Sequence, residues 1–220
     1  MKIYKSTIND ALFKQYMSYL LEGDKTSCSE TIYELLEKKT DIKDIYVNIF
    51  QRSMYEIGTL WEHNKISIAT EHLATMITET LLNLVYPTLF STHRSGQKAI
   101  ICCVANEYHQ IGGKMVADLF EFHGWDGYFL GANTPLSAVL DFINEKQPHL
   151  VGFSLSIPAN RVHLEEVLHE VMAGFKELNV IVGGQAFMHG AGEVLEKFPG
   201  IKYIAGLHEL ESIVLQKEEG

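Results

Sequence analysis

The sequence of 220 residues predicts two domains, an all-α bundle followed by an α/β domain with a parallel sheet. Three observations predict this division. The first part repeats apolar residues at helical intervals, the second part alternates short apolar runs of strand character with helical patterns, and a polar segment without periodicity separates them. A hydrophobic content of 46% over this length is sufficient for two cores.

Composition and charge exclude several classes of protein. The net charge of -10 and the pI near 5.4 argue against a nucleic-acid surface, because phosphate binding needs clustered lysine and arginine. The cysteines form neither a CxxC pair nor a disulfide framework; they are Cys28, Cys102 and Cys103. The sequence shows no signal peptide, lipidation motif or apolar run of membrane-spanning length. We therefore expect a soluble, cytoplasmic protein with no direct nucleic-acid or membrane partner.

The first domain, residues 1–91, is predicted to be a four-helix bundle. Helical patterns cover residues 8–21, 26–38, 42–64 and 67–87. Gly23 stops the first helix, and Asp41 and Ser67 are suitable N-caps for the third and the fourth. Amphipathic helices with short connections bury their apolar faces against one another, so we expect a compact bundle.

A polar segment, residues 92–97, is predicted to link the bundle to the second domain, residues 98–220. The predicted strands there are 99–104, 127–131, 149–155, 179–183 and 201–205, and the helices between them include 110–123, 136–146 and 161–176. Five strands joined by such crossovers predict a doubly wound, flavodoxin-like or Rossmann-like sheet. In this fold, ligands bind beyond the carboxyl ends of the strands, where the strand order reverses.

Polar and glycine residues follow three of the predicted strands, which are neighbours in this topology. They are Glu107, His109 and Gly112 after the first strand, Ser154 and Ser156 at the third, and Gly183 and Gly184 at the fourth. A histidine in such a loop can direct its imidazole toward a ligand, and a carboxylate two residues earlier can hold the other ring nitrogen in one tautomer. Gly112 leaves room for a bulky group. We therefore expect these residues to converge on one crevice.

The spacing of these residues resembles the signature of the cobalamin-binding domains, which is D-x-H-x-x-G followed by a serine and then by Gly-Gly. Here the turn reads Glu107-Tyr108-His109-Gln110-Ile111-Gly112, with Ser154 at 154 − 109 = 45 and Gly184 at 184 − 109 = 75 residues after the histidine. A helical bundle before such a domain is also typical of the family, so the resemblance covers residues 8–215. Glu107 stands where the family usually has aspartate, and its longer arm can still bond His109.

This resemblance implies a cofactor and its binding mode. His109 would be the lower axial ligand to cobalt in place of the cofactor's own dimethylbenzimidazole, the base-off, His-on mode. The displaced nucleotide tail would enter a slot beside Ser154 and Gly183-Gly184. Glycine would admit the tail close to the backbone, and the hydroxyls of Ser154 and Ser156 would bond its polar groups.

A second resemblance lies in the bundle, where residues 61–72 read WEHNKISIATEH. Trp61 ends the third predicted helix, and Glu71 and His72 lie early in the fourth, so a tight turn brings them to one end of the bundle. The set resembles the adenosylcobalamin-dependent light sensors, which include bacterial repressors of carotenoid genes. In that subfamily the Trp covers the 5′-deoxyadenosyl group, the Glu helps hold it, and the His can bind cobalt after photolysis. The Glu-x-His-x-x-G turn is also similar to the subfamily's.

The resemblances imply a light- or cobalamin-responsive sensory module, a photoreceptor that binds adenosylcobalamin and is not an enzyme, with His72 as a candidate upper ligand. Only a short segment precedes the bundle, without the repressors' DNA-binding domain, so we expect signalling through homo-oligomerisation or a partner protein. The alternative is a corrinoid carrier of a methyltransferase system, with methylcobalamin or hydroxocobalamin as the cofactor. A subunit of an adenosylcobalamin mutase fits less well, because the chain has no room for a substrate barrel.

Overall fold

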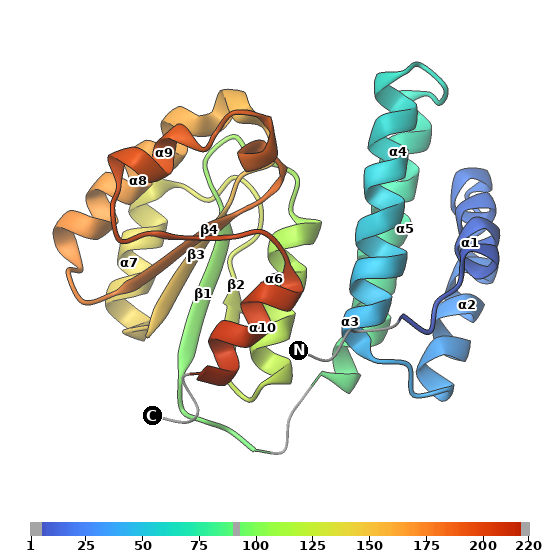
Figure 1. The fold of residues 1–220 in the computed structure, drawn as a ribbon, viewed down its shortest axis with the longest axis horizontal. Helices are drawn as coiled ribbons and strands as arrows, with labels where there is room; N and C mark the ends of the chain where they lie inside the picture. The colour runs from blue at the N-terminus through green and yellow to red at the C-terminus, as the bar shows by residue number, and fades with distance from the viewer. Residues whose placement is uncertain (1–5, 90–92, 217–220) are drawn as a thin grey trace. The chain divides into compact units, whose positions relative to one another are not determined.

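The computed structural model describes residues 6–89 and 93–216, and it divides the chain into two compact units (Figure 1). The first unit ends at Thr88 and the second begins at Leu89. Residues 1–5 and 90–91 of the predicted first domain, Thr92 of the predicted linker, and residues 217–220 lie outside the described residues. Each unit has its own buried core and is described by itself.

The first unit is helical, as the apolar periodicity predicts. Its elements are α1 (Asp10–Glu22), α2 (Lys25–Glu37), α3 (Ile42–Ile45), the π-helix η1 (Tyr46–Gln51), α4 (Arg52–Glu62), α5 (Ile68–Val85) and the 3-10 turn η2 (Tyr86–Thr88). The third predicted helix is thus one helical stretch with a π-helical segment in its middle. The side chains of Asn9, Asp24, Asp41 and Ser67 accept backbone N–H groups at the starts of α1, α2, α3 and α5. Gly23 ends α1 in the left-handed conformation, at φ 73°.

The second unit contains the predicted five-stranded parallel sheet, with the strand order β2-β1-β3-β4-β5. The strands are β1 (Lys98–Cys103), β2 (Asp126–Phe129), β3 (Leu150–Ser154), β4 (Asn179–Gly183) and β5 (Lys202–Ile204). The helices are α6 (Ile111–Phe122), α7 (Leu136–Lys146), α8 (Arg161–Gly174), α9 (Glu193–Lys197) and α10 (Leu207–Gln216), with 3-10 turns η3 (Pro158–Asn160) and η4 (Gln185–His189). This is the order expected of a flavodoxin-like sheet.

Helices cover both faces of the sheet (Figure 1). Alternate residues of the strands, among them Ile100, Val151 and Val182, form one core with buried side chains of α7, α8 and α9. The remaining strand residues face the layer of α6 and α10, which contact each other. The loops at the carboxyl ends of the strands therefore lie at one edge of a three-layer unit.

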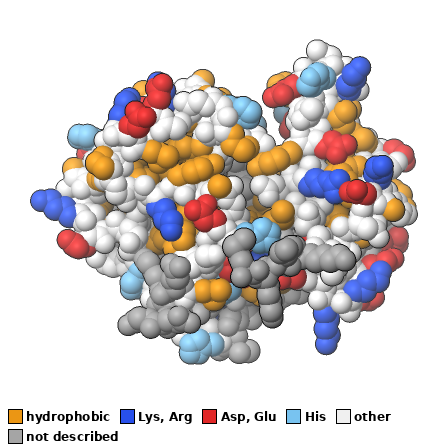
Figure 2. All heavy atoms as spheres, in the orientation of Figure 1, with side chains coloured by type: hydrophobic (Ala, Val, Ile, Leu, Met, Phe, Trp, Pro, Cys, Tyr) orange, Lys and Arg blue, Asp and Glu red, His pale blue; other side chains and the backbone are white. Residues whose placement is uncertain are grey.

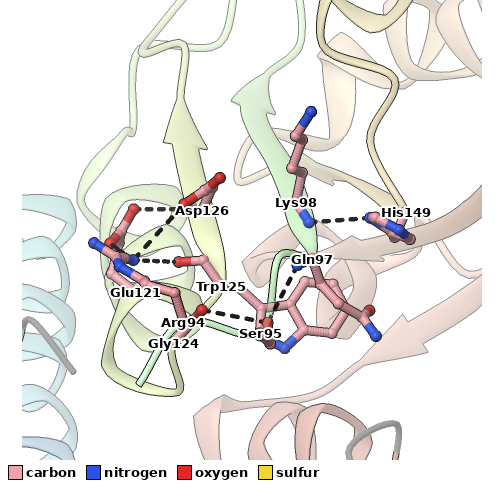
Figure 3. Close-up of polar contacts among 10 residues, drawn as sticks. Arg94, Ser95, Gln97, Lys98, Glu121, Gly124, Trp125, Asp126 and His149 are labelled. Carbon is pink, nitrogen blue, oxygen red and sulfur yellow. Dashed lines mark hydrogen bonds and ion pairs between the residues drawn. The ribbon is translucent and has the colours of Figure 1, made fainter. Parts of the chain in front are cut away.

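The segment just before β1 is bound to the turn between α6 and β2 (Figure 3). Arg94 Nη1 donates to Glu121 Oε2 at 2.7 Å and to the carbonyl of Trp125 at 2.8 Å. The backbone N–H of Ser95 donates to the Gly124 carbonyl at 2.9 Å. Although the sequence places this segment in a linker, residues 94–97 are held by the second unit.

The distribution of basic side chains and the length of the apolar helices both bear on the expectations from composition. On the face drawn in Figure 2, the lysine and arginine side chains of the described residues are dispersed and stand among acidic ones. Within residues 6–89 and 93–216, no helix is both long and apolar enough to span a membrane.

Candidate functional site

The turn after β1 carries a buried carboxylate beside an exposed imidazole. Glu107 Oε1 accepts hydrogen bonds from the backbone N–H of His109 at 3.0 Å and from its Nδ1 at 2.6 Å. Glu107 Oε2 accepts from the backbone N–H groups of Ser156 and Ile157, both at 2.9 Å. The Glu107 side chain has no exposed surface, whereas that of His109 is 59% exposed. The β1 turn and the loop after β3 are thus joined through one carboxylate.

These hydrogen bonds fix the charge of Glu107. Burial alone would raise the pKa of the carboxyl group, but the bonds from His109, Ile157 and Ser156 outweigh it and lower the pKa to about 2. The carboxylate is therefore ionised at neutral pH, and it accepts a hydrogen bond from the Nδ1–H of His109. In this tautomer Nε2 is the ring nitrogen that can bind a metal.

Small residues lie side by side at the carboxyl edge of the sheet. Cys103 is paired with Ser154, and Ser154 with Gly183, so the three form one row across β1, β3 and β4. The row faces α6, since a Cβ on Gly113 would lie 3.7 Å from Cys103 Sγ and 3.6 Å from Ser154 Cβ. A Cβ on Gly112 would meet no atom within 4 Å. The structure thus brings the predicted serine and glycine positions together around small side chains.

Gly184 has a structural role that the sequence does not reveal. Its φ is 109°, and a Cβ there would lie 2.2 Å from the carbonyl oxygen of Leu155. The backbone therefore requires glycine at this position whether or not a ligand is present. Gly183 is also tightly packed, because a Cβ added there would lie 3.1 Å from the Ile204 carbonyl oxygen.

Replacement of Gly184 by alanine is expected to lower the free energy of unfolding of the second unit by about 2 kcal/mol, because the new methyl group overlaps the Leu155 backbone. Chemical denaturation followed by the fluorescence of the buried Trp125 in a Trp61→Phe background measures this. Gly192→Ala is the matched control, because its Cβ would meet nothing within 4 Å. Equal midpoints for the two variants would contradict this packing role.

Four polar side chains that the sequence analysis did not select hold the same turn. They are Asn106, Asn133, Asn160 and His163. Asn106 and Asn133 have positive φ values of 63° and 50°, a conformation that asparagine tolerates better than most residues. The dipeptides Asn106-Glu107 and Asn133-Thr134 are ordinary turn sequences, so only the fold reveals that these residues meet.

The second predicted group lies at one end of the helical unit. α4 and α5 pack against each other and are joined by the short turn 63–67, so they run antiparallel, with Thr75 Oγ1 3.9 Å from Met54 Sδ. Trp61 follows Met54 by two helical turns, and the start of α5 precedes Thr75 by two turns, so Trp61 and the Glu71-His72 pair lie near the same end.

At this end of the helical unit, hydrogen bonds join Glu71 to His72 and to Thr75. His72 Nδ1 is 2.5 Å from Glu71 Oε2, and Thr75 Oγ1 donates to Glu71 Oε1 at 3.2 Å. Trp61 is 44% exposed. This end therefore combines an exposed aromatic surface with a bonded carboxylate-imidazole pair.

Comparison with known proteins gives matches in both units. Models of the B12 binding domain match residues 97–213 and residues 12–86. The HTH-type transcriptional repressor CarA of Myxococcus xanthus is 28% identical over 152 residues, which cover 68% of this chain and 51% of the repressor. The chain thus spans about half the length of this curated relative.

Two solved structures share the fold. The monomethylamine corrinoid protein of Methanosarcina barkeri has a TM-score of 0.82 and 14% identity, covering 96% of this chain and 100% of that protein. The methanol:cobalamin methyltransferase complex MtaBC of the same organism has a TM-score of 0.51 and 16% identity, covering 98% of this chain and 82% of the matched chain. At such identities the likeness concerns the fold alone.

Proposed function

From the premise that this chain belongs to the family of B12 binding domain proteins, we propose that it is a sensory module that binds adenosylcobalamin in the base-off, His-on mode. The observation that carries this proposal is the pairing of Glu107 with His109. The buried carboxylate holds Nδ1 at 2.6 Å, so the exposed ring offers Nε2 to cobalt. The bound cofactor would supply a cobalt–carbon bond that light cleaves.

The residues around His109 fit the remainder of the cofactor. The residues Cys103, Ser154 and Gly183 form a row of small side chains beside α6, and the nucleotide tail would enter along this row. The hydroxyls of Ser154 and Ser156 would bond its polar atoms, and Gly112 would allow the corrin to approach the turn. Gly184 would contribute through its backbone.

The helical unit would cover the upper face of the cofactor. Trp61 offers an exposed indole that would pack on the adenosyl group. Glu71, held by Thr75, would accept a hydrogen bond from the adenosyl group, and His72 would be available as a second cobalt ligand after photolysis. The likeness to a transcriptional repressor supports a regulatory output, which would pass through homo-oligomerisation or a partner protein.

The alternative function is a corrinoid carrier that moves a methyl group on methylcobalamin, or holds hydroxocobalamin, between enzymes. The shared fold accommodates either function. The exposed Trp61 with its neighbouring carboxylate favours the sensor, because a carrier needs an upper face that partner enzymes can reach.

The test is the absorption spectrum of the purified chain loaded with adenosylcobalamin in the dark, recorded before and after green light. We expect illumination to change the spectrum of the wild type. His72→Ala is expected to alter only the illuminated spectrum, because His72 would act only after photolysis. His63→Ala is the matched control, since His63 lies at the same end of the helices but is bonded to the Thr59 carbonyl at 2.8 Å.

An unchanged spectrum under green light would contradict light sensing. Tighter binding of methylcobalamin than of adenosylcobalamin, together with methyl transfer to a partner enzyme, would favour the carrier.

A further inference from the structure

Asn106 stands at the centre of a hydrogen-bond network that joins the turn after β1 to the neighbouring loops. Its backbone N–H donates to Asn133 Oδ1 at 2.8 Å, in the loop between β2 and α7. Its carbonyl accepts from Asn160 Nδ2 at 2.9 Å, in η3. Its side-chain Nδ2 donates to His163 Nε2 at 2.8 Å, in the first turn of α8. Every polar group of the Asn106 backbone is therefore bonded to a segment distant in the sequence.

The network also reaches the next residue. The backbone N–H of Asn133 donates to the carbonyl of Glu107 at 2.9 Å, while the Glu107 carboxylate is bonded to the N–H groups of Ser156 and Ile157. The peptide groups on both sides of the Glu107 α-carbon are thus fixed. A rotation of the Asn106 backbone would move the carboxylate away from these amides, and with it the bond to the His109 ring.

From these contacts we propose that Asn106 and His163 are positioning residues that hold Glu107, and through it the imidazole of His109, in the geometry required for the metal. This inference rests on the proposed function of His109. Neither residue needs to touch the cofactor. His163 is the distant end of this arrangement, because it lies in α8 and its Nε2 is hydrogen-bonded to the Asn106 side chain.

Three variants separate positioning from general support of the fold. Asn106→Gly keeps the positive φ without strain but removes the side chain that bonds His163. His163→Ala removes the acceptor. His163→Gln restores an acceptor, because the amide oxygen can accept from Asn106 Nδ2. His169→Ala is the matched control, because His169 is an exposed histidine of the same helix whose Nδ1 lies 3.2 Å from Oε1 of its neighbour Glu170.

The first measurement uses the protein without cofactor. Nitrogen-15 NMR of the His109 ring is expected to show a defined Nδ1–H tautomer in the wild type, in His169→Ala and in His163→Gln. In Asn106→Gly and His163→Ala we expect averaged ring signals, and faster hydrogen exchange at the amides of Ser156 and Ile157. Unchanged His109 signals in both disrupting variants would overturn the proposal.

The second measurement is the titration of each variant with adenosylcobalamin in the dark. We expect Asn106→Gly and His163→Ala to bind about tenfold more weakly, with a larger base-on share in the spectrum, and His163→Gln to recover most of the loss. If His109→Ala changes the spectrum but these two variants do not, the positioning role is wrong and the proposed function stands. If His109→Ala changes nothing, the proposed function itself fails.

Discussion

The His109→Ala variant is expected to bind cobalamin about 100-fold more weakly than the wild type and to lose the His-on spectrum. The methyl side chain offers no ligand, so the cofactor would keep its own dimethylbenzimidazole on cobalt, and this base-on form cannot place its tail beside Ser154 and Gly183. Titration of the purified protein in the dark, followed by absorption, measures both effects. The fold should be unaffected, because the His109 side chain is 59% exposed.

Two controls make this experiment specific. His169→Ala removes an exposed histidine of α8 and should bind as the wild type does. Imidazole added to His109→Ala should restore part of the His-on spectrum, because the free ring can occupy the space of the lost side chain. Wild-type affinity with an unchanged spectrum in His109→Ala would show that cobalt is not held through this turn.

The order of most helices and strands follows from the sequence because these elements show either a helical apolar period or a short continuous apolar run. The strand runs of β1 and β3 are buried on both faces, and the repeating apolar positions of α5 face one core. α9 and α10 were not predicted. α9 has only five residues, too few for a period, and it is stabilised by packing of its buried Val194 on the core of the sheet.

The π-helix η1 is invisible in the sequence for a related reason. Tyr46, Ile49 and Phe50 are all apolar and all buried, so the local pattern is compatible with a regular helix as well as with a widened turn. Periodicity alone does not contain that information.

The candidate site was partly accessible from the sequence. The resemblance to the cobalamin-binding signature selects Ser154 and Gly184 by their spacings of 45 and 75 residues from His109, and the parallel topology predicts that these strand ends meet at one edge. The bond of Glu107 to the His109 ring was predicted, but its other two partners were not accessible, because they are backbone N–H groups of Ser156 and Ile157, which leave no trace in residue identity. The contact of Asn106 with His163 joins positions 57 residues apart through loop conformation.

Removal of the Glu107 carboxylate is expected to damage both stability and binding. Glu107→Ala leaves the N–H groups of His109, Ser156 and Ile157 without their acceptor, and we expect the second unit to lose about 3 kcal/mol of unfolding free energy at neutral pH. Cobalamin affinity should fall about 10–100-fold, because the His109 ring loses the group that orients it. Denaturation of the cofactor-free protein and titration with cobalamin measure the two effects separately.

The stability effect has a definite pH dependence. The pKa of Glu107 is lowered in the folded protein from 4.5 to about 2, because its hydrogen bonds outweigh burial, which alone would raise it. A lowered pKa stabilises the fold above the unfolded value, so the contribution is complete above about pH 5 and is lost as the pH falls from about 4.5 toward 2. The difference in unfolding free energy between wild type and Glu107→Gln should therefore be largest at neutral pH and shrink at about pH 3.

The control for this pH series is Glu196→Gln, which alters an exposed glutamate of α9 and should follow the wild-type curve. Glu107→Gln keeps the size of the side chain, but one of its two terminal atoms is a donor that faces backbone N–H groups. The loss of stability in Glu107→Gln is therefore expected to come from the lost charge and hydrogen bonds and not from changed packing. A difference from the wild type that stays constant down to about pH 3 would show that the buried group is not an ionised carboxylate, and that His109 is oriented by something other than its charge.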